Sequence, residues 1–101
     1  MSYSVTVSSL AASLMGESIA FLARVDEKAA EALRKNLVNA ISSLSSMPDR
    51  YPFLDDPCLT RNKYRKMVVG SRFLLLYLIK GSEVSVEYVL DCRKSYSWLI
   101  G

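Results

Sequence analysis

Three strand-like runs decide the fold: LTRNKYRKMVV (residues 59–69), FLLLYLIK (residues 73–80) and EVSVEYVLDCRKSY (residues 83–96). Gly70-Ser71 and Gly81-Ser82 separate them, and short glycine-containing breaks are typical of β-hairpin turns. The runs therefore predict an antiparallel meander with strands over residues 59–69, 72–80 and 83–90. Because the middle run is apolar at nearly every position, we expect it to be the central strand, partly covered on both faces.

The first 25 residues predict one strand and one helix. SYSVTVS (residues 2–8) alternates apolar and small polar residues, which is the period of a half-buried strand. Ser8 or Ser9 can accept a hydrogen bond from the first amides of a helix that runs to about Arg24. Its expected apolar positions are Leu10, Leu14, Phe21 and Val25.

A second helix is predicted from Asp26, a good N-cap, with Glu27 complementing the helix dipole. Its apolar stripe consists of Ala30, Leu33, Leu37, Ala40, Ile41 and Leu44. SSMPDRYPFLDDP (residues 45–57) then contains three prolines, so we expect an ordered connector rather than a helix or a central strand.

The order strand, helix, helix, strand, strand, strand predicts an α+β fold, β-α-α-β-β-β. The helices form an N-terminal hairpin packed on one face of an antiparallel sheet. A chain of 101 residues that is 50% hydrophobic suits a single domain, residues 1–101.

Several functional classes receive no support from the sequence. The longest apolar run, residues 73–79, is too short to span a bilayer, and the N-terminus does not resemble a secretion signal, so we expect a cytoplasmic protein without a membrane partner. Cys58 and Cys92 lack metal-ligand spacing and are expected to be reduced thiols. We expect no metal and no cofactor.

Positive charge belongs to the second half of the chain. Residues 1–58 contain five basic and seven acidic residues, whereas residues 59–101 contain eight basic and three acidic ones. Such a basic segment attracts phosphate backbones or an acidic protein partner, and it can also be a solvated strand face.

Motifs along nearly the whole chain resemble the RelE/ParE toxin superfamily of bacterial type II toxin–antitoxin systems. They are the opening strand ending in serines, the helix hairpin, the MPDRYP connector (residues 47–52), Tyr64-Arg65-Lys66, the apolar strand with Tyr77, and DCRKSY (residues 91–96). Each pattern is short, and their order and spacing carry the resemblance.

The resemblance implies a growth-inhibiting toxin that is silenced by a cognate antitoxin. It favours a ribosome-dependent, metal-independent mRNA endonuclease of the RelE kind, with a ParE-like inhibitor of DNA gyrase as the alternative. A toxin-like module that has lost activity and only binds its antitoxin is the third possibility. A basic groove would suit an antitoxin tail that is acidic or amphipathic and folds as it binds.

RNA cleavage needs a base, an acid and positive charge near the scissile phosphate. The chain has no histidine, so lysines or tyrosines with lowered pKa values would have to serve. By position in the motifs, the resemblance implies Arg65, Arg93 and Tyr96 as catalytic residues. The candidates for RNA binding are Arg61, Lys63, Lys66, Arg72 and Lys94.

Strand alternation puts Arg61, Lys63 and Arg65 on one face, which forms an open groove if the helices cover the other face. Two positions depart from the RelE pattern, because Met67 and Leu74 stand where cations are expected. Arg65 and Arg93 could instead contact an antitoxin. We expect the tyrosines of the three runs, Tyr64, Tyr77 and Tyr88, to serve mainly in packing.

Overall fold

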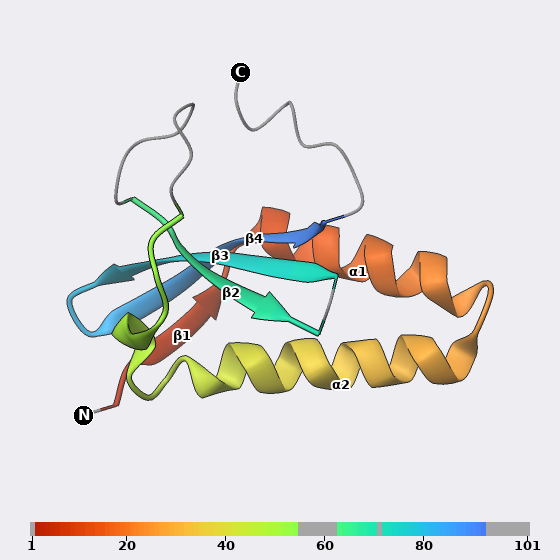
Figure 1. Cartoon of the computed structure of the whole chain (residues 1–101), viewed down its shortest axis with the longest axis horizontal. Helices are drawn as coiled ribbons and strands as arrows, with labels where there is room; N and C mark the ends of the chain where they lie inside the picture. The colour runs from red at the N-terminus through yellow and green to blue at the C-terminus, as the bar shows by residue number, and fades with distance from the viewer. Residues whose placement is uncertain (1, 55–62, 71, 93–101) are drawn as a thin grey trace, which may run out of the picture.

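The computed structural model describes residues 2–54, 63–70 and 72–92 of the chain. Its elements follow the predicted order: β1 (Ser4–Val7), α1 (Ser9–Ala23), α2 (Glu27–Ser43), a 3-10 turn (Pro48–Arg50), β2 (Arg65–Val69), β3 (Phe73–Lys80) and β4 (Glu83–Asp91). Figure 1 shows the helices side by side as a hairpin along the sheet. The predicted α+β architecture is confirmed.

The sheet has the order β1-β4-β3-β2, so β3 lies in its interior as expected. The pairs β2–β3 and β3–β4 are antiparallel, which confirms the meander. β1 pairs with β4 in parallel, from Ser4 opposite Glu83 to Val7 opposite Val86. The helix hairpin is the crossover that such a parallel pair requires, and it makes the sheet mixed.

Both helices pack on the same face of the sheet. The core cluster joins Ala11 of α1 and Leu37 and Ala40 of α2 to alternate residues of β3 and β4. Leu76 points to the opposite face of β3 and is only 1% exposed, so the strand is covered on both faces there, as predicted.

Hydrogen bonds at the start of both helices explain where they begin. The Ser8 side chain accepts from the Ala11 amide at 3.0 Å and donates to the Glu87 carbonyl at 3.0 Å, so the cap also ties α1 to β4. Asp26 accepts from the Ala29 amide at 3.0 Å. The predicted stripe of α2 is buried or partly buried throughout.

The predicted stripe of α1 is largely wrong. Leu10, Phe21 and Val25 are 44%, 64% and 79% exposed, and Leu14 alone among the four predicted residues packs against the core. Ala11 is fully buried instead, with Met15 and Ile19 packed nearby. Ala11, rather than Leu10 or Phe21, therefore marks the face of the helix that meets the sheet.

A β-bulge interrupts the pairing of β4 with β3. Leu76 pairs with Tyr88 whereas Tyr77 pairs with Val86, so Glu87 is the extra residue. Val84, Val86 and Val89 therefore join the core cluster. Simple alternation along the strand would keep Tyr88 and Leu90 on the face of Val84, and the bulge turns both to the opposite face.

The connector is ordered as predicted over its described part, residues 45–54. After the 3-10 turn it runs beside the start of β2, with Phe53 bridged to Arg65 and the Lys66 amide donating to the Pro52 carbonyl at 2.9 Å. The strand expected from residue 59 begins at Arg65 in the described chain, because Lys63 and Tyr64 are not in strand conformation.

Candidate functional site

The predicted site residues divide between described and undescribed parts of the chain. Arg61, Arg93, Lys94 and Tyr96 lie outside the described residues. The other four, Lys63, Arg65, Lys66 and Arg72, occupy three separate places. Arg65 and Arg72 mark opposite ends of the β2–β3 hairpin, because Arg65 pairs with Tyr77 while Arg72 adjoins the Val69–Phe73 pair.

Arg65 lies on the face that the helices cover. It alternates with Met67 and Val69, which both pack against the core cluster. An open groove lined by Arg61, Lys63 and Arg65 would require the helices to cover the opposite face of the sheet. At β2 the helices cover the face that carries Arg65, so this requirement is not met.

The guanidinium of Arg65 holds the connector in place. Its Nη1 donates to the Asp49 carbonyl at 3.1 Å and to the Tyr51 carbonyl at 2.6 Å, and the group lies 4.1 Å from the centre of the Phe53 ring. Charged hydrogen bonds to backbone carbonyls and stacking on an aromatic face are both structural contacts. Arg65 thus has a structural role whether or not it also meets a ligand.

Lys63 and Arg65 nevertheless line one hollow. The hollow has a volume of about 310 Å³, and its other lining residues are Tyr3, Asp49, Phe53 and Ile79. Two cations beside one carboxylate make it mildly basic, and this is the closest approach of the described chain to the predicted cationic site.

Tyr77 belongs to the same end of the sheet but is not available to substrate. It is fully buried, and its hydroxyl donates to the Pro48 carbonyl at 2.5 Å. Burial raises the pKa of Tyr77 from 10.0 to about 12, although the positive charge of Arg65 opposes this shift. The prediction that Tyr77 serves in packing is confirmed.

Lys66 lies on the other face of the sheet, which the helices leave free. There Tyr64 and Tyr88 contact each other edge to face, with ring centres 5.7 Å apart. Burial, with a smaller contribution from Tyr64, raises the pKa of Tyr88. A tyrosine base in RNA cleavage needs the opposite shift, so neither Tyr77 nor Tyr88 is suited to that role.

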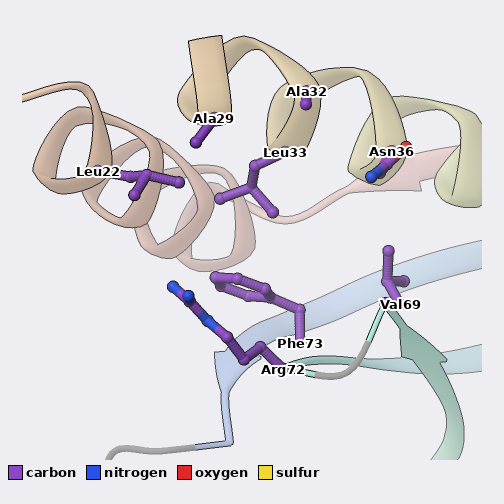
Figure 2. A pocket seen from close by; sticks show the side chains of 9 residues that line it. Leu22, Ala29, Ala32, Leu33, Asn36, Val69, Arg72 and Phe73 are labelled. Atoms are coloured by element: carbon purple, nitrogen blue, oxygen red, sulfur yellow. The ribbon is translucent and has the colours of Figure 1, made fainter. Parts of the chain in front are cut away.

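Arg72 lies at the far end of the hairpin, where a groove separates the sheet from the helices (Figure 2). We call this the hairpin groove. It consists of a hollow of about 290 Å³ and a hollow of about 220 Å³ that share Leu22, Arg72 and Phe73. Figure 2 shows the side chains of Arg72 and Phe73 rising from the sheet toward Leu22 and Leu33.

The groove is apolar apart from a few groups. The larger hollow is also lined by Ala29, Ala32, Leu33, Asn36, Val69 and Gly70, and the smaller one by Ser18, Phe21, Val25 and Asp91. Arg72 stands 5.7 Å from the Phe73 ring centre, and its Nε is buried without a hydrogen-bond acceptor among the described residues. An unsatisfied buried donor of this kind costs about 1–3 kcal/mol.

The sequence reasoning missed the hairpin groove because it assigned Phe21 and Val25 to a buried stripe. The available signal was the apolar excess of α1, which exceeds what one face of a helix can bury. Within residues 2–54, 63–70 and 72–92, no cluster of acidic or cysteine side chains could hold a metal ion. No helix in these ranges is long and apolar enough to cross a membrane.

Sequence comparison finds no match, whereas structural comparison finds a shared fold. No protein-family model and no curated protein match the sequence. A chain in the solved structure titled "Chromosomal ParDE TA system from P. aeruginosa" superposes with a TM-score of 0.72 at 16% identity, over 88% of this chain and 95% of that one. At this identity the match establishes a shared fold, and it is the fold predicted from the RelE/ParE resemblance.

Proposed function

We propose that the chain is the toxin of a type II toxin–antitoxin system and that it inhibits growth by acting on DNA gyrase rather than by cutting mRNA. The observation that carries the proposal is the shared fold with a chain of a ParDE system over almost the full length of both chains. The order of sequence motifs, which resembles RelE/ParE toxins, independently supports the toxin assignment.

The chemistry of the sheet favours the gyrase alternative. Arg65, the first catalytic candidate, already binds two connector carbonyls and the Phe53 ring. Met67 packs against the core and Leu74 is apolar, so neither residue supplies the positive charge that a RelE-like nuclease has at that position. Tyr77 and Tyr88 have raised pKa values, which disfavours them as bases at neutral pH.

Ribosome-dependent mRNA cleavage remains the second candidate because Lys63 and Arg65 line one hollow. The catalytic roles of Arg93 and Tyr96, and RNA binding by Arg61, Lys66, Arg72 and Lys94, belong to this alternative. In either case we propose a cognate antitoxin as the partner.

Induced expression in a bacterial host, with and without the product of the adjacent reading frame, tests the toxin assignment. We expect growth arrest that the co-expressed product relieves. Unimpaired growth at verified expression would indicate a module that has lost its activity.

Two further measurements on the arrested cells and the purified protein separate the targets. The gyrase proposal expects loss of DNA supercoiling by purified gyrase and no new 5′ ends in ribosome-bound mRNA. New mRNA ends that disappear in Arg93→Ala or Tyr96→Phe variants would overturn it in favour of the endonuclease. The conservative Lys63→Gln change in the basic hollow should leave gyrase inhibition unchanged, because the hollow is part of the nuclease alternative alone.

A further inference from the structure

The hairpin groove is an apolar surface that the described residues leave uncovered at its rim. Phe21 and Val25 stand 64% and 79% exposed beside the smaller hollow, and the exposed Ala32 and Asn36 border the larger one. Contiguous exposed apolar surface with a polar rim is typical of protein interaction sites. The groove is also distinct from the basic hollow at the opposite end of the hairpin.

Arg72 gives the groove a specific chemistry. Its Nε is buried, and the Arg72 side chain takes part in none of the ion pairs or hydrogen bonds found among the described residues. Asp91 lines the smaller hollow together with Arg72, whereas the lining of the larger hollow contains no acidic residue. A guanidinium in low-polarity surroundings binds a carboxylate strongly, and the larger hollow is the side from which a carboxylate can approach.

A nucleic acid does not fit this arrangement. Binding to a phosphate backbone is supported by several cations along a track, whereas Arg72 is the single cationic residue among those lining the two hollows. An amphipathic protein segment fits better, because it can place apolar side chains over Phe73 and Leu33 and one carboxylate beside Arg72.

We propose that the hairpin groove binds an apolar segment of the cognate antitoxin and that Arg72 pairs with an aspartate or glutamate of that segment. The inference rests on the proposed toxin function for the identity of the partner. It names the place and the chemistry of binding: the larger hollow receives the apolar side chains, and the guanidinium of Arg72, whose Nε is buried, receives the carboxylate.

Binding of the purified antitoxin, taken as the product of the adjacent reading frame, tests the location. Ala32→Trp fills the larger hollow from an exposed position, so the fold should tolerate it. We expect it to weaken binding by about 100-fold, as for a blocked hot spot. Ala12→Trp is the matched control, since Ala12 is equally an exposed helical alanine but lines neither hollow, and it should change affinity by less than about twofold. Unchanged binding by Ala32→Trp overturns the location.

The role of Arg72 has its own variant. Arg72→Met keeps the length and apolar stem of the side chain and removes the charge. We expect a loss of affinity of about 10-fold to 100-fold and a weaker dependence of binding on salt. Equal affinity and equal salt dependence for Arg72→Met and the native chain would overturn the carboxylate pairing.

A small probe decides the chemistry of the groove even if the antitoxin assignment fails. In an NMR titration, 3-phenylpropanoate should shift the backbone amide signals of Leu33, Asn36 and Phe73, and the uncharged 3-phenylpropanamide should shift them far less. The difference should vanish in Arg72→Met. Equal shifts from both compounds, or no shift from either, would contradict the proposed chemistry of the groove. If the probe behaves as expected but the antitoxin does not bind the native chain, the proposed toxin function is contradicted instead.

Discussion

The two ends of the β2–β3 hairpin each carry an arginine, but only one of the two side chains has hydrogen-bond acceptors among the described residues. At the connector end, Arg65 donates to the Asp49 and Tyr51 carbonyls and lies over Phe53. At the groove end, the Nε of Arg72 is buried without an acceptor among the described residues. The difference teaches that the role of an arginine depends on the hydrogen-bond acceptors that the fold places beside it. With acceptors the guanidinium stabilises the structure, and without them it is free to bind a ligand.

The largest effect on stability is expected from Arg65→Ala. The change removes two charged hydrogen bonds and a cation–π contact and leaves the connector carbonyls without their donor, so unfolding should become easier by about 2–3 kcal/mol. Urea denaturation followed by circular dichroism measures it. A residue that served only catalysis would leave the urea midpoint where it is, and that outcome would contradict the structural role.

Arg65→Lys is the control for charge. Lysine keeps the positive charge but lacks the planar fork that reaches two carbonyls and stacks on an aromatic ring. We expect it to restore only part of the stability lost in Arg65→Ala. Full restoration would indicate that charge alone, rather than the geometry of the guanidinium, stabilises this end.

Tyr77→Phe should have the next largest effect. It leaves the Pro48 carbonyl without its donor inside the core, which should lower the free energy of unfolding by about 1–2 kcal/mol near neutral pH. The same denaturation measurement applies. An unchanged stability would mean that the short contact between the hydroxyl and the carbonyl contributes nothing.

The same residue predicts a response to alkali. Burial raises the pKa of Tyr77 from 10.0 to about 12, so above pH 10 the unfolded chain loses this proton while the folded chain keeps it. Its contribution should be constant below that pH and should fall as the pH rises toward 12, by up to about 3 kcal/mol. Denaturation curves across this range should therefore fall more steeply for the native chain than for Tyr77→Phe.

Arg72→Met should behave unlike both of these variants. Because the buried Nε has no acceptor among the described residues, removing it should leave stability unchanged or raise it by about 1 kcal/mol. Thermal unfolding of the two proteins at equal concentration measures the difference. A clear loss of stability would place Arg72 in the same structural class as Arg65 and end the contrast.

The smallest effect is expected from Val25→Ser at the rim of the groove. Val25 is 79% exposed, so the folded chain gains little from its apolar side chain, and the change should stay within about 0.5 kcal/mol. Val89→Ser, in the core cluster, is the contrasting substitution and should be strongly destabilising. Similar losses for both would indicate that the rim is covered in solution.

The sequence-based prediction was correct where the hydrophobic pattern was compatible with only one structure. The α2 stripe recurs at helical spacing with polar residues between, so its buried face follows from the sequence alone. In α1 apolar residues surround the helix, and periodicity could not identify the face on which Ala11 meets the sheet. The β4 bulge was equally hidden, because Val84 to Tyr88 alternate regularly in the sequence although Glu87 is the extra residue opposite β3.

The candidate site was predicted in composition but not in arrangement. Lys63 and Arg65 do line a common hollow, whereas Lys66 lies on the other face and Arg72 at the other end of the hairpin. Strand alternation places Arg65 on one face together with Met67, but it cannot say which face the helices cover. The roles of Arg61, Arg93, Lys94 and Tyr96 stay predictions.

The sequence by itself determined the order of elements, the meander and the second helix, because hydrophobic period and turn residues act locally along the chain. Only the tertiary structure decided which face of the sheet the helices cover, where the bulge moves Tyr88, and which arginine finds acceptors. These outcomes depend on contacts between residues far apart in the chain, such as Arg65 with Asp49 and Tyr77 with Pro48. No local pattern encodes the distance between such partners.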